Sequence, residues 1–420
     1  MSPVLHFDII ALIIDIVGEN GADTKFLRKL ALVSHSFLHI CRKHLFATIE
    51  LYDRNPDLMR HCHIASSKNL FVKLLESKPD VAKYIRKLTY TIGYRVQSPR
   101  FSPHLNLDND DNLPPPILPN FFRTIPRLNS LKINVSLSDW NDLNPSLTSA
   151  FLHLMHLPTI NHIDLSYIYN FPLSSLAAPA VNLLRLDICK LSDVDRLFEG
   201  DYSSELVVQS EIMPKIRELR AFDSSLLMTK LLHAKMQDGR PAFNFVDLRR
   251  LDMSSRRSID DQNIRYILQN AKSLEKLCLY IGHQSSVDLH DIPSISAGTL
   301  KVLDLSVSLY SNPLTFSGIW EGLEAMAGRN MLEALSFKIQ VDGGESEDVI
   351  GSILQKAEDV LVKPGWSTLR QVSIKIEIIV PTEEDFPELI EALQSLPGKY
   401  LSHLLNHESI AFNFSAYGSI

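Results

Sequence analysis

Three short stretches carry residue types that could do chemistry. The segment "RHCHI" (Arg60–Ile64) places two histidines and a cysteine together, and these are the ligand types of zinc. The segment "DNDDN" (residues 108–112) offers the carboxylate and amide oxygens that calcium prefers. Glu383 and Glu384 form a carboxylate pair, and carboxylates serve as general acid and base in many enzymes.

None of these stretches meets the further requirements of its chemistry. Adjacent residues point in different directions on a helix or strand, and no second Cys/His pair follows "RHCHI" at zinc-finger spacing. An EF-hand loop needs glycine at its sixth and glutamate at its twelfth place, where this sequence has Leu113 and Pro119. The glutamate pair lies at an expected helix start, where the helix dipole favours acidic residues. We therefore predict no metal site.

Enzyme motifs are also missing from the sequence. There is no glycine-rich phosphate loop of the GxxxxGK[ST] or GxGxxG type, and no G-x-S-x-G elbow. His407-Glu408 stands alone, without the second histidine of an HExxH motif. We therefore predict that the chain is not an enzyme and takes no cofactor or small-molecule substrate.

Composition limits the partners and the compartment. Apolar residues make up 45% and charged residues 22% of the 420, which is typical of a globular chain. The net charge of −7 argues against a general nucleic-acid binder. The first apolar run contains Asp15 and is about half a membrane span, so we expect neither a signal peptide nor an anchor. The four cysteines lie far apart (Cys41, Cys62, Cys189 and Cys278), which favours reduced thiols in the cytoplasm and/or nucleus.

The elements that would position a functional surface begin with three short helices. The helix expected over 6–17 has two apolar faces, one with Ile9, Leu12, Ile13 and Ile16 and the other with Ile10, Ile14 and Val17. After a turn, the second helix is expected to carry Phe26, Leu27, Leu30, Val33 and Phe37, and the third Leu38, Cys41 and Leu45. Because a helix with two apolar faces must be buried on both sides, the rest of the chain or another protein must cover one face.

The segment "LHFDIIALIIDIV…FLRKLALVSHSFLHICRKHLFATIEL" resembles an F-box of the type common in basidiomycete fungi. The family pattern has Leu-Pro-x-Glu, two aliphatic residues, a helix, Leu-x-x-x-x-Leu-Val-x-x-x-Trp, and a closing segment with His, Leu and Phe. The matching positions are Leu5, Asp8, Ile9, Ile10, Ile13, Leu27, Leu32, Val33, Phe37, His44, Leu45 and Phe46. Two positions depart from it: His6 replaces the usual proline and Phe37 the usual tryptophan.

The resemblance implies docking on the Skp-type adaptor of a cullin-based ubiquitin ligase, which would cover the second apolar face. It places the adaptor-binding residues at Leu5, Ile9, Ile13, Leu32, Val33 and Phe37. The departures at His6 and Phe37 bear on adaptor affinity. The alternative is that these helices pack against the following domain and bind nothing.

Beyond Glu50 the sequence repeats a unit of the form L-x-x-L-x-L. Its copies begin at Ile85, Leu128, Ile160, Leu183, Ile216, Leu248, Leu274, Leu300, Leu332 and Leu369. Helical periodicity lies between copies, over 146–157, 258–271, 316–330, 346–362 and 382–396. A strand, a turn and a helix in repetition predict an α/β solenoid with parallel strands on the concave side and helices on the convex side.

The segment "LHLMHLPTINHIDLSYIYNFPLSSL" (residues 152–176) resembles fungal F-box proteins with a leucine-rich-repeat domain. The predicted organisation is therefore an F-box-like helical domain over 1–50, a linking helical segment over 51–84 and an irregular leucine-rich-repeat solenoid over 85–420. Prolines, asparagines and acidic residues over 97–119 predict an exposed loop within it.

The concave face would bind the target protein. Its outward positions follow from the repeat, and the candidate target-binding residues among them are Asp164, Asp187, Arg220, Asp252, Tyr280, Asp304, Lys338 and Lys375. Since aspartates on neighbouring strands repel one another unless a basic group lies between them, we hypothesise that this face takes a basic target segment. The alternative is that these aspartates are ordinary solvated strand residues.

Taken with the resemblance, these features predict the substrate-recognition subunit of a ubiquitin ligase. It would bind a Skp-type adaptor, through it a cullin, and a target protein, with no nucleic-acid or membrane partner. The second interpretation is a leucine-rich-repeat scaffold whose degenerate F-box has no role in a ligase.

Overall fold

A computed structural model describes residues 7–19, 24–53, 67–92, 117–177, 183–190, 207–208, 213–282, 285, 287, 289–292, 294–309, 317–342, 347–379 and 386–419. The contacts divide the chain into two compact units. Unit 1 comprises Met1–Leu183 and Lys190–Tyr202, and unit 2 comprises Leu184–Cys189 and Ser203–Ile420. The division between the units falls inside the predicted solenoid segment (85–420), and unit 1 joins the N-terminal helices to the first strands of the repeat region.

Unit 1 begins with three helices and continues as strands that alternate with helices. Its elements are α1 (Phe7–Glu19), α2 (Thr24–Ala31), α3 (His35–Leu45), β1 (Thr48–Asp53), α4 (Ser67–Ser77), η2 (Pro79–Tyr84), β2 (Lys87–Ile92), α5 (Ile117–Thr124), β3 (Ser130–Asp139), η4 (Trp140–Asp142), α6 (Pro145–Met155), β4 (His162–Tyr169) and α7 (Ser174–Ala177). The strands pair in parallel in the order β1-β2-β3-β4. The rings of Phe122 and Phe151 enclose the buried Tyr90 at 5.9 and 5.3 Å between centroids, which forms the centre of this core.

Unit 2 continues the same alternation. Its elements are β5 (Arg185–Cys189), β6 (Val207–Val208), β7 (Glu218–Phe222), α8 (Ser225–His233), β8 (Lys235–Met236), β9 (Arg250–Ser255), α9 (Ser258–Asn270), β10 (Lys276–Ile281), η6 (Leu289–Asp291), α10 (Ser294–Ala297), β11 (Val302–Ser308), α11 (Ser317–Met326), β12 (Ala334–Asp342), α12 (Glu347–Leu361), β13 (Gln371–Ile379), α13 (Phe386–Tyr400), α14 (Ser402–Leu405) and β14 (Ala411–Ser419). The strands of its sheet are parallel and follow the order β5-β7-β9-β10-β11-β12-β13-β14. β6 and β8 form a small separate sheet.

The repeat explains why each strand forms where it does. In every predicted copy a strand begins two residues after the first apolar residue, which is itself buried. In the copy at Leu300, the side chains of Leu303 and Leu305 are buried while Asp304 between them lies on the other face. The predicted α/β architecture with parallel strands is therefore confirmed, and the strand order is the one that a solenoid-type fold requires.

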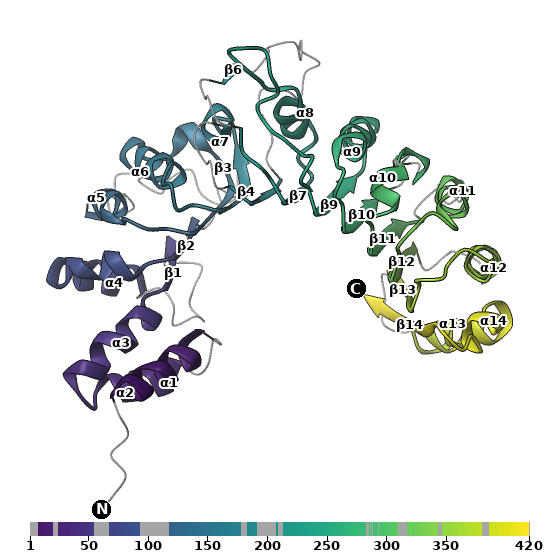
Figure 1. Cartoon of the computed structure of the whole chain (residues 1–420), viewed down its shortest axis with the longest axis horizontal. Coiled ribbons are helices and arrows are strands. Elements are labelled where there is room, and N and C mark those ends of the chain that lie inside the picture. The colour runs from purple at the N-terminus through teal and green to yellow at the C-terminus, as the bar shows by residue number, and fades with distance from the viewer. Residues whose placement is uncertain are drawn as a thin grey trace, which may run out of the picture. The chain divides into compact units, whose positions relative to one another are not determined.

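The helices of unit 2 lie together on one side of its strands. Figure 1 shows α8, α9, α11, α12 and α13 on the outer side and strands β7 to β14 on the inner side. The inner face is therefore the one on which the residues between the buried leucines are displayed. None of the helices that the structure describes is both long and apolar enough to cross a membrane.

Some elements differ from the predicted ones. β1 and β14 lie at the two ends of the repeat region and were not predicted. β1 follows a copy of the unit, Phe46-x-x-Ile49-x-Leu51, that lies inside the segment assigned to the F-box, whereas β14 does not contain the unit. Residues Ile117–Pro119, assigned to the exposed loop, instead begin α5, where Leu118 is fully buried. The rest of that loop (97–116) lies outside the described residues, as do "RHCHI", "DNDDN" and the glutamate pair.

Candidate docking and target-binding surfaces

The three N-terminal helices share a small core. Ile14 of α1, Leu27 of α2 and Cys41 of α3 are buried at its centre, and burial raises the pKa of the Cys41 thiol. Ile10 and Val17 of α1 pack against this centre. One of the two apolar faces predicted for the first helix is therefore used inside this bundle.

The other face of α1 is exposed. Ile9, Leu12, Ile13 and Ile16 follow the i, i+3, i+4, i+7 spacing of a single helical stripe, and all four side chains are exposed. Large apolar side chains that gather on one face of a helix are a mark of an interaction site. Sequence reasoning identified this stripe but assigned only Ile9 and Ile13 to adaptor binding, so Leu12 and Ile16 extend the predicted surface.

A second exposed apolar group lies in the turn between α2 and α3. Leu32 and Val33 are 88% and 66% exposed, which are the largest values among the exposed apolar side chains of the described residues. The second helix was expected to continue through Phe37, but it ends at Ala31. The cause is Ser34, whose side chain accepts a hydrogen bond of 3.2 Å from the Phe37 N–H and caps α3. The cap forces a turn that presents both side chains to solvent.

The remaining predicted adaptor residues lie elsewhere. Phe37 is half-buried, packs against the bundle core and stacks on Phe7 with 6.1 Å between ring centroids. Its role in the structure is therefore at least partly internal. Leu5, like His6, lies outside the described residues. Of the six predicted positions, Ile9, Ile13, Leu32 and Val33 are the exposed ones.

A polar contact fixes α1 on α3. The Asp15 carboxylate lies 2.7 Å from His44 Nε2 and 3.1 Å from Lys43 Nζ. The hydrogen bond to His44 is the main cause that holds the pKa of Asp15 below its usual value. Gly18 makes this approach possible, because a Cβ there would overlap with the ring of His44. The polar contact therefore sets the orientation of the exposed stripe relative to α3.

The predicted target-binding aspartates of unit 2 are already paired within the chain. The buried Asp252 accepts hydrogen bonds from Arg250 at 2.8 to 3.1 Å, and Arg220 Nε lies 2.9 Å from Oδ2 of the same carboxylate. Asp187 is bound in the same way by Arg185 and lies 3.9 Å from Arg220 Nε. These hydrogen bonds raise the pKa of Arg185 and Arg250 above its usual value. The repulsion expected between neighbouring aspartates is therefore offset by arginines of the same chain.

The same pattern continues on both sides of this pair of aspartates. In unit 1, Lys132 Nζ lies 2.7 Å from Asp164. In unit 2, Lys276 Nζ lies 2.8 Å from Asp304, and this contact raises the pKa of Lys276. The buried Cys278 thiol donates to Asp304 at 3.3 Å, and its pKa is raised chiefly by burial.

Sequence reasoning overlooked the basic partners, although a signal was present. In three strands a basic residue stands two positions before the residue on the inner face: Arg185 before Asp187, Arg250 before Asp252 and Lys276 before Cys278. Because residues two apart share one face of a strand, each basic side chain lies on the inner face as well.

The two lysines predicted for the far end differ in their surroundings. Lys338 Nζ lies 2.9 Å from Glu377, whereas the side chain of Lys375 is exposed. The hypothesis of a basic target segment stays a prediction. Because Asp187, Asp252 and Asp304 are paired within the chain, they offer such a segment fewer unpaired carboxylates than the sequence suggested.

Tyr280, the aromatic candidate, lies at the edge of a cleft. The cleft has a volume of about 340 Å³ and is lined by Arg256, Tyr280, Ile281, Gly282, Ser306, Ser308 and Gln340. The ring of Phe222 meets that of Tyr280 edge-on at 5.1 Å, and Arg256 is held 3.1 Å from Asp223. The cleft lies at the carboxyl ends of the strands and could hold one polar or aromatic side chain of a target.

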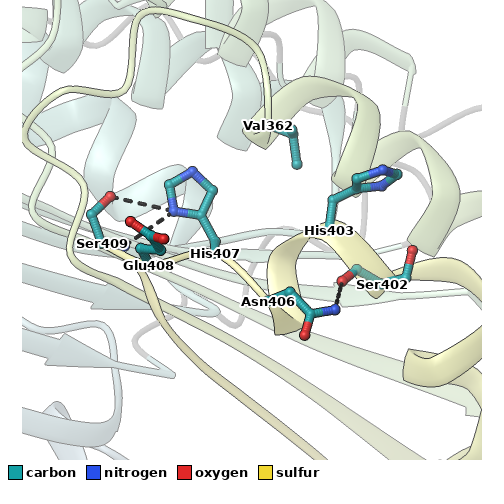
Figure 2. A pocket seen from close by; sticks show the side chains of 7 residues that line it. All are labelled: Val362, Ser402, His403, Asn406, His407, Glu408 and Ser409. Atoms are coloured by element: carbon teal, nitrogen blue, oxygen red, sulfur yellow. Dashed lines mark hydrogen bonds between the residues drawn. The ribbon is translucent and has the colours of Figure 1, made fainter.

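A larger, more open cleft of about 670 Å³ lies beside α14 and is shown in Figure 2. It contains serine, histidine and glutamate, the residue types of a hydrolytic site. His407 Nδ1 lies 3.3 Å from Ser409 Oγ, two residues away. The nearby buried Glu358 accepts from the N–H groups of His403 and Leu404 and contacts the His403 ring at 3.3 Å. Glu358 is thus used to hold α14, and the cleft gives no triad geometry among the described residues.

No protein-family model matches this chain, and no curated protein matches it either. The two surfaces, the apolar one on the N-terminal helices and the polar one on the inner face of the strands, therefore carry the functional conclusion.

Proposed function

We propose that this chain is a substrate receptor of a cullin-based ubiquitin ligase. Its N-terminal helices form an F-box that docks on a Skp-type adaptor, and its strand–helix repeats form an irregular leucine-rich-repeat solenoid that holds a target protein. The observation that carries the proposal is the exposed apolar surface of Ile9, Leu12, Ile13 and Ile16 together with Leu32 and Val33. Four of these residues are those that the F-box resemblance assigns to the adaptor.

The energetics of association support a role for such a surface. Interfaces bury roughly 800 Å² per partner, and a few central apolar residues carry most of the affinity. The stripe lies on a helix that already packs through Ile14 on Leu27 and Cys41, so the helix need not be formed on docking. An adaptor with an apolar groove would remove these side chains from water, which offsets the cost of leaving them exposed in the free chain.

The mechanism requires no chemistry from this chain. The solenoid holds the target while a ubiquitin-loaded conjugating enzyme elsewhere in the complex reaches the target's lysines. Holding both in one assembly replaces an encounter in solution by a high effective concentration. The residues of this chain therefore bind and orient, and the reacting groups belong to its partners.

The first test is co-expression of the full chain with a Skp-type adaptor, followed by size-exclusion chromatography. We expect the two to co-elute. The variant Leu32→Asp/Val33→Asp should abolish co-elution, because it replaces the two most exposed apolar side chains of these helices by charges. These two positions are preferable to Phe37, whose packing on Phe7 and on the core makes a charged substitution there a threat to folding.

A matched control is available in unit 2. Val246 and Val362 are also exposed valines, and the variant Val246→Asp/Val362→Asp adds the same charge away from the N-terminal helices. It should co-elute with the adaptor as the unsubstituted chain does. Circular dichroism of all three proteins checks their folding. If the folded unsubstituted chain elutes without the adaptor, the receptor function is wrong and the repeat scaffold with a degenerate F-box is favoured.

A further inference from the structure

The strand β14 forms the end of the sheet of unit 2. It pairs in parallel with β13 from Ala411, opposite Gln371, to Ser419, opposite Ile379. Among the described residues no strand pairs with its other side. A strand edge of this length carries a row of N–H and C=O groups that can pair with another strand.

The direction of these groups follows from one hydrogen bond. The Ala411 N–H donates to the Arg370 carbonyl at 2.7 Å, so Ala411 points its backbone groups toward β13. Alternate residues of a strand point the same way. The backbone groups of Phe412, Phe414, Ala416 and Gly418 consequently point toward the free side.

The usual protections of a strand edge are missing from β14. Natural edge strands are kept apart by lysines or other charges, by prolines, or by being very short. The sequence of β14, "AFNFSAYGS", contains no charged residue and no proline over its nine residues. Its aromatic residues favour a strand. Nothing in its sequence therefore opposes pairing with a further strand.

The apolar side chains at this end are also incompletely covered. Phe412 and Phe414 are half-buried, whereas the corresponding residues one strand further in, Val372 and Ile374, are almost fully buried. Leu405, at the end of α14, is 50% exposed. The end repeat of a solenoid normally carries a polar outer face. Here Phe412, Phe414 and Leu405 leave apolar surface uncovered at this end, so both the backbone and these side chains are suited to a further strand.

We propose that β14 is the site where a second copy of this chain docks, with the two β14 strands antiparallel about a twofold axis. Such an interface uses the same surface on both copies, so it must be complementary to itself. An uncharged strand meets this condition because no like charges are brought together. A twofold pairing centred on Ser415 sets Phe412 opposite Gly418 and Phe414 opposite Ala416, so that every free backbone group finds a partner.

The pairing also covers the exposed side chains. Both copies of Phe412 and Phe414 lie on the helix side of the joined sheet, where each copy shields the other from water. The other end strand of the described sheet, β1, carries Glu50 and Asp53, so β14 is the uncharged one of the two, and an interface between two copies of it closes after two chains. If the proposed function holds as well, the dimer carries two adaptor-docking surfaces and two target-binding faces, which strengthens the capture of targets with more than one recognition segment.

The experiment is sedimentation velocity of the full chain over a series of concentrations. The twofold register places the two Ser415 side chains directly opposite each other, roughly 5 Å apart at Cβ. The variant Ser415→Lys/Lys375→Gln puts two lysines at that position. Because Lys375 is the β13 neighbour of Ser415, its replacement by glutamine avoids repulsion within one copy. Lys375→Gln alone is the matched control.

We expect dimers of the unsubstituted chain and of Lys375→Gln, and monomers of the double variant. Hydrogen exchange of residues 411–419 in the unsubstituted chain gives a second measurement that needs no substitution. These amides should exchange more slowly at high than at low protein concentration. The proposal is overturned by a monomer at every concentration, by a series of larger species, or by exchange that does not depend on concentration. Dimers that persist in the folded double variant overturn it as well.

Discussion

At the scale of single residues, the inner face of unit 2 is a set of ion pairs that forms within and between neighbouring strands. Asp252 is the most connected member, since it lies against Arg250 on its own strand and Arg220 on the next. Each of these aspartates contacts at least one basic residue, so the negative charge of the row is largely compensated. An aspartate at such a position therefore stabilises the fold through its ion pair. A target that binds this face would contact the pair and not an isolated carboxylate.

We expect Asp252→Asn to lower the free energy of unfolding by about 3 kcal/mol, because it leaves two arginines close together without their shared carboxylate. Urea denaturation followed by circular dichroism measures the change. The control is Asp238→Asn in the exposed pair with Arg240, where we expect little effect. Equal effects of the two substitutions would show that the pairing around Asp252 adds nothing to stability.

Gly18 gives a second prediction at this scale. Alanine normally stabilises a helix relative to glycine by about 1 kcal/mol. At Gly18 in α1, however, the new Cβ would overlap with the ring of His44, which Asp15 holds in place. We therefore expect Gly18→Ala to destabilise the protein by about 1–2 kcal/mol, as overpacking does.

Gly398 in α13 is the matched control, because no atom lies within 4 Å of a Cβ built there. Gly398→Ala should raise the stability by up to about 1 kcal/mol. Thermal unfolding of both variants measures the two signs. An increase in melting temperature for Gly18→Ala similar to that of Gly398→Ala would contradict the close packing of α1 on His44.

At the scale of elements, sequence reasoning succeeded where a pattern repeats. The strands from β2 to β13 of the main sheet each follow a predicted copy, because the same burial of the same leucines recurs in every repeat. The five predicted helices between copies all correspond to helices, α6, α9, α11, α12 and α13. Periodicity is strong evidence because each element must bury one defined face.

Elements without that pattern could not be identified in this way. β14 has a neighbour on one side and so does not need the full set of apolar positions, as the half-buried Phe412 and Phe414 illustrate. β1 has buried Ile49 and Leu51 but was overlooked because its residues were assigned to the end of the F-box. The break after α2 was overlooked because the apolar spacing of Leu30, Val33 and Phe37 continues through it. The deciding residue, Ser34, acts through one hydrogen bond to the backbone rather than through burial. Leu32 was identified through the resemblance and not through periodicity, and Val33, although part of the apolar spacing, was assigned to adaptor binding only through the resemblance.

The cap gives a prediction at the scale of elements. Ser34→Ala removes the hydrogen bond to the Phe37 N–H and should lower stability by about 1 kcal/mol. It also loosens the turn that presents Leu32 and Val33, so binding of the adaptor should weaken. Chemical denaturation and a titration with the adaptor measure the two effects. Ser36→Ala, at an exposed position of the same helix, is the control and should change neither quantity.

At the scale of the whole molecule, the free chain presents a problem of solubility. The bundle core centred on Ile14, Leu27 and Cys41 is small, while a larger number of apolar side chains of the same helices face water. Contiguous exposed apolar surface promotes association between copies unless a partner covers it. The proposed adaptor would be that partner, and its presence during expression should therefore raise the soluble fraction of this chain.

The variant Leu12→Lys/Ile16→Glu removes two apolar side chains from the exposed stripe without changing the net charge, since the two added charges cancel. It therefore separates the effect of exposed apolar surface on solubility from the effect of net charge. The new lysine and the new glutamate would also follow Asp8 at successive i, i+4 spacings with alternating charge, which supports α1. We expect the soluble fraction of the unsubstituted chain to rise on co-expression with a Skp-type adaptor. The variant should be soluble alone and gain nothing from the adaptor, because the same side chains cause both behaviours. A gain of equal size in both proteins, or in neither, would mean that the stripe of α1 is not the surface that the adaptor covers.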